Sequence, residues 1–151
     1  MSKIIDIIRK GTPEDEGYFD HVVVLDGGVE LFSGAISTEP NPYKPLNHRP
    51  WHDVYARIAE GEYVWKCIAD HEKYGRCLLI NNGGIVRTLN PNSNHHGEYM
   101  ATQIFVHDGY SETWRGSKGC ITVPPSSELG FFKCFDDNET GKLTIRKGDV
   151  V

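Results

Sequence analysis

Residues 21–34 read HVVVLDGGVELFSG, and this stretch decides the fold. An apolar run over residues 21–25 is followed by Asp26-Gly27-Gly28 and then by a second run that favours a strand. Two runs of this kind joined by a short glycine turn are typical of a β-hairpin. The sequence therefore predicts antiparallel strands at residues 21–25 and 29–34.

The same pattern of short strands and polar turns continues on both sides of this hairpin. Further strands are predicted at residues 62–68, 76–80, 85–89, 103–107, 120–123 and 143–146, with polar loops at 38–50 and 90–97. A helical turn or two is expected at residues 53–58. A second helix is expected to begin near Ser126 or Ser127, with an apolar face of Leu129, Phe131, Phe132 and Phe135. This order predicts a mainly β sandwich or barrel with one or two short helices.

The length of 151 residues fits one domain with its own core. Residues 1–20 are predicted to be an N-terminal extension, and residues 21–151 the domain. The formal net charge of -5 leaves no basic excess to neutralise phosphates, so no nucleic-acid partner is expected.

No apolar run approaches the ~20 residues that span a membrane, so no membrane span is expected. Asp6 interrupts the apolar stretch near the N-terminus, and no small-residue cleavage site follows it. The sequence therefore predicts a chain without a signal peptide, made in the cytoplasm.

Cysteine usage favours free thiols, because four cysteines are few for a disulfide scaffold and lack zinc-ribbon spacing. Cys67, Cys77 and Cys134 lie among apolar neighbours and are expected to be inert core residues. Cys120 differs from them, because it directly follows Gly119 at the start of a predicted strand.

His107 ends the apolar strand that precedes Cys120, which lies thirteen residues later. A catalytic thiolate needs an adjacent imidazole, and that imidazole needs a third group on its other ring nitrogen. The carbonyl of Asp108 is the nearest such group in the sequence, and Gly119 allows a tight turn close to a substrate. Cys120 and His107 are therefore a candidate catalytic pair. The alternative is a small core cysteine and a surface histidine.

The loop between these two residues contains Trp114 and Arg115. Arg115 is expected to pair with a substrate carboxylate, and Trp114 to form a wall of the pocket; the alternative is a surface-packed indole and a solvated guanidinium. Four other histidines are candidate metal ligands together with His107: His48, His52, His95 and His96. Pro50 separates the first two, and adjacent residues in a strand point in opposite directions, so no metal site is predicted.

Val106-His107-Asp108-Gly109, followed by Ser117-Lys118-Gly119-Cys120-Ile121-Thr122, resembles the signature of the L,D-transpeptidase (YkuD-like) catalytic domain. Weaker resemblance extends to the family's opening hairpin at residues 22–36, to its Gly-x-Tyr strand entry at residues 60–63 and to its final strand at 143–145. Residues from about 20 to 147 are covered.

The resemblance implies an L,D-transpeptidase-like sandwich or barrel and cysteine acyl transfer on peptidoglycan stem peptides, without a cofactor. It makes Cys120 the nucleophile and His107 the base, and assigns the oxyanion to the N–H groups of Gly119 and Cys120. A thioester then passes to an amine, which is transpeptidation, or to water, which is carboxypeptidase or endopeptidase activity; the sequence leaves both open. It also implies a phage or bacterial chain that acts on the cell wall after export or lysis.

Lys118 stands where the family has its second histidine. It could supply a cation to the substrate or lower the pKa of Cys120, and with Ser117 it is expected to lie at the substrate. The departure also favours an alternative, a catalytically silent binding or structural module of phage type. A cysteine peptidase or amidase with an unrelated substrate is a third reading.

Overall fold

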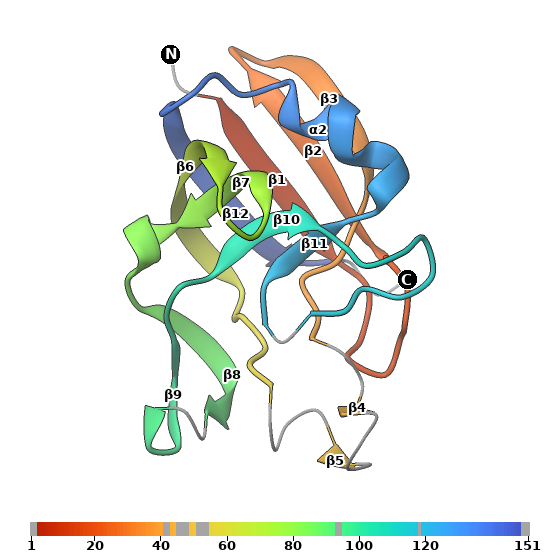
Figure 1. The fold of residues 1–151 in the computed structure, drawn as a ribbon, viewed down its shortest axis with the longest axis vertical. Helices are drawn as coiled ribbons and strands as arrows, with labels where there is room; N and C mark the ends of the chain where they lie inside the picture. Colours follow the sequence, from red (N-terminus) through yellow and green to blue (C-terminus); the bar gives the residue numbers. More distant parts are fainter. Residues whose placement is uncertain are drawn as a thin grey trace.

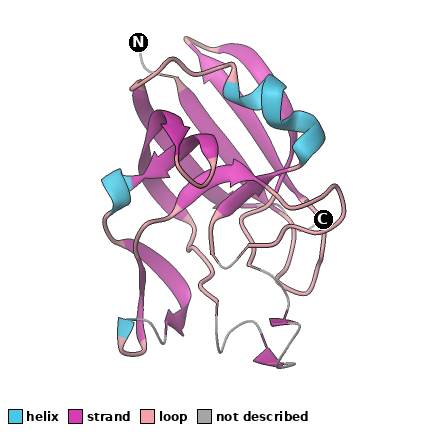
Figure 2. Cartoon of the chain, viewed as in Figure 1, coloured by secondary structure: helices cyan, strands magenta, loops and turns pink. Residues whose placement is uncertain are grey.

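The computed structural model of the chain describes residues 3–40, 55–92, 95–117 and 119–148, and the backbone of residues 43–44 and 49–50. Strands dominate it, so the domain is mainly β, as the sequence predicts (Figure 2). The described elements are β1 (Ile4–Arg9), β2 (Asp20–Asp26), β3 (Val29–Ile36), β4 (Tyr43–Lys44), β5 (Arg49–Pro50), β6 (Gly61–His71), β7 (Gly75–Ile80), η1 (Asn81–Gly83), β8 (Val86–Asn92), β9 (Glu98–Ala101), β10 (Phe105–Asp108), β11 (Ile121–Val123), η3 (Pro125–Ser127), α2 (Glu128–Phe132) and β12 (Thr140–Lys147).

Eight strands form one sheet in the order β11-β10-β7-β6-β12-β1-β2-β3 (Figure 1). The predicted β2–β3 hairpin lies at one end, and positive φ angles at Gly27 and Gly28 form its turn. The β1–β12 and β10–β11 pairs run parallel. The other neighbouring pairs described in this sheet are antiparallel. A long connection is needed between parallel neighbours, and residues 109–120 provide it between β10 and β11.

β1 corrects the predicted boundary at residue 20. It lies inside the sheet, parallel to β12 and antiparallel to β2. Ile5 and Ile7 on this strand are fully buried in the core. The apolar stretch that the sequence analysis placed in an extension is therefore a strand of the domain.

The two ends of the sheet meet at Ser37, directly after β3, and Thr122 in β11. The Ser37 N–H donates to the Thr122 carbonyl at 2.8 Å, and the Thr122 N–H donates to the Ser37 carbonyl at 2.9 Å. These bonds bring the sheet close to a closed barrel. They also fix β11 only two residues from Cys120.

Aromatic side chains attach α2 and the residues that directly follow it to the sheet. The Phe32 and Phe131 rings lie 5.6 Å apart, and the Trp65 and Phe135 rings lie 4.8 Å apart, both edge to face. Leu129 does not belong to this face, because 84% of it is exposed. The helix begins where the sequence predicts, with Ser127 at the N-cap position, but the Ser127 side chain makes no cap hydrogen bond.

Two further predictions are corrected by contacts distant in sequence. The helical turn expected at residues 53–58 is absent from its described part, where Ile58 instead forms a β-bridge with Thr88. The loop expected from residue 90 begins later, because β8 continues to Asn92. The Asn90 side chain binds the backbone of Tyr55 and Arg57 there.

The cysteines predicted to lie in the core are buried and unpaired: Cys67, Cys77 and Cys134. Cys120 is also a free thiol, and it is only partly buried. In the described part of the chain no helix has the length and apolar character needed to cross a membrane.

Candidate active site

β10 carries His107 just beyond the residues that pair with β7, where the strand still pairs with β11. It lies opposite Thr122 of β11, and the preceding residue, Val106, lies opposite Leu78 of β7. The ring Nδ1 donates a hydrogen bond to the carbonyl oxygen of Asp108 at 2.7 Å. This contact fixes the tautomer with a proton on Nδ1, which leaves Nε2 able to accept one. It joins the two groups that the sequence analysis paired, and their catalytic role stays a prediction.

Cys120 lies at the residue before β11, beside β10. Its sulfur accepts a hydrogen bond from the backbone N–H of Phe105 at 3.4 Å. Phe105 and His107 are two residues apart on one strand, so their side chains share a face and are separated by about 6.6 Å. The pairing of β10 with β11 therefore places the thiol and the imidazole on the same edge of the barrel.

The turn between β6 and β7 lies over this edge (Figure 1). The Tyr74 ring stacks on the His107 ring, with centroids 4.1 Å apart and an angle of 8° between their planes. The rings of Tyr74 and His71 also pack against the ring of Phe105, with centroid distances of 5.3 Å and 4.9 Å. His71, Tyr74, Phe105 and His107 therefore form a cluster of four rings, and the backbone N–H of Phe105 within it binds the Cys120 sulfur.

Burial sets the charge states of the pair. Desolvation lowers the pKa of His107 below its ordinary value of 6.5, against the opposing effects of the Asp108 carbonyl and carboxylate. Desolvation also raises the pKa of the Cys120 thiol, although the Phe105 N–H, the charge of Lys73 and a hydrogen bond from the Tyr74 side chain each lower it. The resting pair is thus a neutral thiol and a neutral imidazole.

Ser117 and Gly119 shape the backbone that leads into Cys120. The buried Ser117 hydroxyl donates to the Cys120 carbonyl at 2.6 Å and accepts from the Gly119 N–H at 3.0 Å. This corrects two expectations: Ser117 is buried in the turn instead of facing a substrate, and the Gly119 N–H is already engaged instead of facing an oxyanion. Gly119 has a φ of +149°, a conformation that side chains rarely adopt.

Arg115 does not present its guanidinium to the site, contrary to the expected pairing with a substrate carboxylate. The side chain is 1% exposed and donates hydrogen bonds to the carbonyls of Gly17, Glu39 and Pro40. Arg115 therefore holds the 109–117 loop against the segments around residues 17 and 40. Trp114, beside it, is partly exposed, and its backbone N–H donates to the Ser111 hydroxyl.

Several sequence-predicted residues lie outside the described residues, namely Lys118, His48 and His52. His95 lies with its Nε2 3.5 Å from the Thr102 hydroxyl, in the β8–β9 excursion. Among the described residues, no group of three or more His, Cys, Asp or Glu side chains is placed to hold a metal ion.

The sequence analysis missed the ring cluster contributed by His71, Tyr74 and Phe105. His71 and Tyr74 flank a turn that ends in Gly75, with a φ of +68°, so the turn itself has a sequence signal. Its position over β10 depends on the pairing of β7 with β10, which local sequence does not encode.

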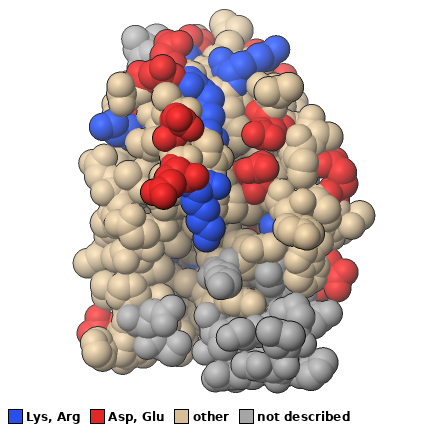
Figure 3. Space-filling view, viewed as in Figure 1, with Lys and Arg blue, Asp and Glu red and all other residues tan. Residues whose placement is uncertain are grey.

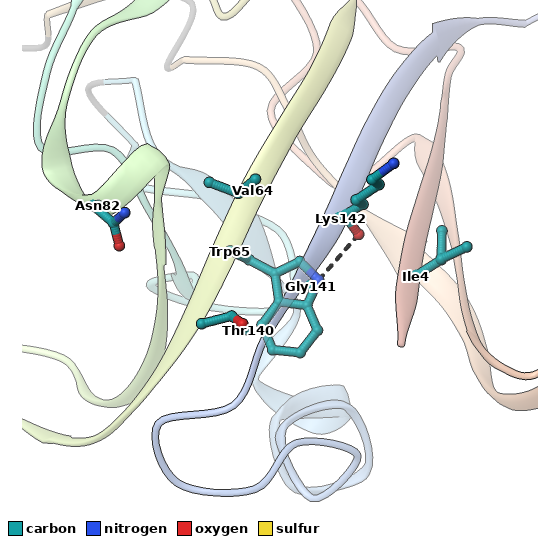
Figure 4. Close-up of a pocket in the computed structure, with 7 residues that line it drawn as sticks. All are labelled: Ile4, Val64, Trp65, Asn82, Thr140, Gly141 and Lys142. Atoms are coloured by element: carbon teal, nitrogen blue, oxygen red, sulfur yellow. Dashed lines mark hydrogen bonds between the residues drawn. The ribbon is translucent and has the colours of Figure 1, made fainter. Parts of the chain in front are cut away.

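A hollow of about 580 Å³ lies elsewhere, on the face formed by β1, β6 and β12 (Figure 4). Trp65 forms its floor and donates through Nε1 to the Lys142 carbonyl at 3.0 Å. Its lining residues are Ile4, Val64, Trp65, Asn82, Thr140, Gly141 and Lys142. Among the described residues that line this hollow there is no cysteine, histidine or acidic side chain.

Charge is mixed on the face shown in Figure 3, where acidic and basic side chains alternate over its upper half. No single-sign patch covers the described part of this face.

Comparison of the chain with models of protein families, with curated proteins and with solved structures gives no match.

Proposed function

We propose that this chain is a cysteine acyltransferase or peptidase of the L,D-transpeptidase type, acting on peptidoglycan stem peptides. One observation carries the proposal: a partly exposed thiol beside an imidazole-bearing strand, with the imidazole Nδ1 held by a main-chain carbonyl. Nucleophilic thiol catalysis uses these two groups, and in the proposed reaction Nε2 of His107 comes within hydrogen-bond reach of the thiol. The substrate class comes from the resemblance of the motif around His107 and Cys120.

In the proposed reaction, Nε2 of His107 takes the thiol proton as the sulfur attacks a peptide carbonyl carbon. The tetrahedral intermediate collapses, the C–N bond breaks, and the leaving amine takes the proton from His107. The resulting thioester is attacked by an amine or by water, which returns the thiol. Transfer and hydrolysis share every step but the last.

The pKa directions favour general-base catalysis over a preformed ion pair. Burial keeps His107 neutral, the form that accepts a proton, and keeps Cys120 protonated before substrate binds. The Gly119 amide is held by Ser117, so the oxyanion requires another donor or a shift of this turn.

The engaged Gly119 amide also favours a second candidate, a catalytically silent binding or structural module on the same fold. In that case Ser117 and Gly119 serve only to close the turn before β11. The two candidates differ in whether Cys120 forms a covalent intermediate.

The test is incubation of the protein with purified disaccharide tetrapeptides and pentapeptides, followed by mass spectrometry of peptides and of intact protein. We expect loss or exchange of a terminal residue and an acyl adduct on Cys120. Cys120→Ala should lower turnover by at least about a thousandfold, because the nucleophile is gone.

Cys134→Ala is the matched control, since it removes a free thiol that is buried after α2. It should retain turnover. Wild-type turnover in Cys120→Ala, or no reaction and no adduct with any of these peptides in the wild type, would reject the proposal.

A further inference from the structure

The β6–β7 turn is held in one shape by His71. Its Nδ1 accepts hydrogen bonds from the N–H groups of Lys73 at 3.0 Å and Tyr74 at 3.2 Å. The His71 ring also stacks on the Tyr74 ring, with centroids 5.1 Å apart. Contacts within the turn therefore hold Tyr74 in place, independently of its contact with β10.

The Tyr74 ring then covers one face of the His107 ring, nearly parallel at 4.1 Å. A hydrogen bond to Nδ1 holds one edge of an imidazole but leaves a broad range of rotation about the ring torsion. A parallel ring at contact distance removes that freedom, because rotation would drive the imidazole into it. The Asp108 carbonyl and the Tyr74 ring thus restrain His107 in two different directions.

We propose that Tyr74 is a positioning residue of this site, whose ring fixes the plane of the His107 imidazole beside Cys120. The role rests on the proposed function, because an oriented base is needed only where Cys120 is a nucleophile. Phe105 supports the same arrangement, since its ring contacts Tyr74 at 5.3 Å while its N–H binds the Cys120 sulfur.

The charged and titratable groups that act on the two reactive side chains come from three segments. His107 is influenced by Asp108 on its own strand, and by Lys73 and His71 from the turn. Cys120 is influenced by Lys73 and Tyr74 from that turn, and it in turn acts on Cys77 in β7. A change at Tyr74 leaves each of these other groups in place.

The experiment compares Tyr74→Phe and Tyr74→Leu with the wild type in two measurements that need no peptide substrate. The first is the titration of the His107 ring by NMR. The second is the rate of iodoacetamide alkylation against pH, with Cys120 followed by peptide mapping so that Cys77 is counted separately. Tyr99→Leu, at an exposed position on β9, is the matched control.

Tyr74→Leu should uncover His107, so that the pKa of its imidazole rises toward 6.5. Tyr74→Phe keeps the ring and should leave that titration in place. It should lower alkylation of Cys120 at neutral pH roughly fivefold, the effect of losing one hydrogen bond to a thiolate. Tyr99→Leu should match the wild type in both measurements.

His107 titrations that superimpose for the wild type and a folded Tyr74→Leu would overturn the proposal. If Tyr74→Leu does not fold, Tyr74→Met takes its place, because it removes the ring and keeps much of the bulk; a His107 titration there that superimposes on that of the wild type would overturn the proposal. A wild type with no acyl transfer, but with these shifts present, would reject the proposed function while leaving the contact between Tyr74 and His107 established.

Discussion

Burial lowers the pKa of His107, so this side chain is expected to make the folded domain less stable in acid. Well above pH 6.5 the imidazole is neutral in both the folded and the unfolded chain. As the pH falls below 6.5 the unfolded chain takes up a proton that burial disfavours in the folded state. Stability is therefore lost progressively until the pH passes the lowered pKa of the folded protein.

We predict that His107→Gln removes this contribution. The difference in unfolding free energy between the wild type and the variant should shrink as the pH falls from about 7 to about 5, because only the wild type carries the cost. Urea unfolding at several pH values measures it, and the other titrating groups cancel in the difference. A difference that stays constant with pH would show that this imidazole is not desolvated on folding.

At the scale of the element, the conformation of Gly119 restricts which residues the turn before β11 can accept. Gly119 lies at a φ of +149°, and a Cβ there would be 3.2 Å from the Ala56 carbonyl oxygen. Gly28, in the β2–β3 hairpin, has a φ of +86°, and a Cβ there would have nothing within 4 Å. An alanine at Gly28 would therefore suffer backbone strain alone, whereas an alanine at Gly119 would suffer backbone strain and a close contact with Ala56.

We therefore predict that Gly119→Ala lowers the free energy of unfolding by about 1–3 kcal/mol and changes the reactivity of Cys120. Gly28→Ala should cost about 1–2 kcal/mol through its φ alone and leave the thiol unchanged. Urea unfolding and thiol alkylation measure both effects. Equal alkylation rates in the two variants would show that the Gly119 conformation does not place the cysteine.

Elements with a local signal could be predicted from the sequence. The β2–β3 hairpin follows from its apolar runs and its glycine turn, and β6, β7, β11 and β12 fall within a few residues of their expected positions. β1 escapes prediction because its apolar run lies beside a polar segment, and only its pairing with β12 identifies it as a strand of the core.

The candidate site could be predicted only in part. His107, Asp108 and Cys120 lie within fourteen residues of one another in the sequence, and a local pattern therefore indicates them. The structure brings them to one edge of the sheet. Tyr74 and the buried state of Arg115 depend on segments that are far away along the chain. Contacts of that kind leave no periodicity in a single sequence.

At the scale of the whole molecule, β1 tests where the domain begins. We predict that Ile7→Ala, which empties a fully buried position, costs about 2–5 kcal/mol of unfolding free energy. Ile4→Ala on the same strand, where 42% of the residue is exposed, should cost within about 1 kcal/mol. Chemical denaturation of the two variants decides the matter, and similar small losses would place this strand outside the cooperative unit.

The position of β12 also has a consequence for synthesis on the ribosome. Residues 140–147 lie between β6 and β1, so they join the β11-β10-β7-β6 half of the sheet to the β1-β2-β3 half. Until this strand emerges, both halves present an unpaired strand edge, and such edges are prone to join those of other chains. A nascent chain therefore depends on β12, the last strand of the described residues, to join the two halves, and stalling before residue 140 should leave it open to capture by chaperones or to aggregation.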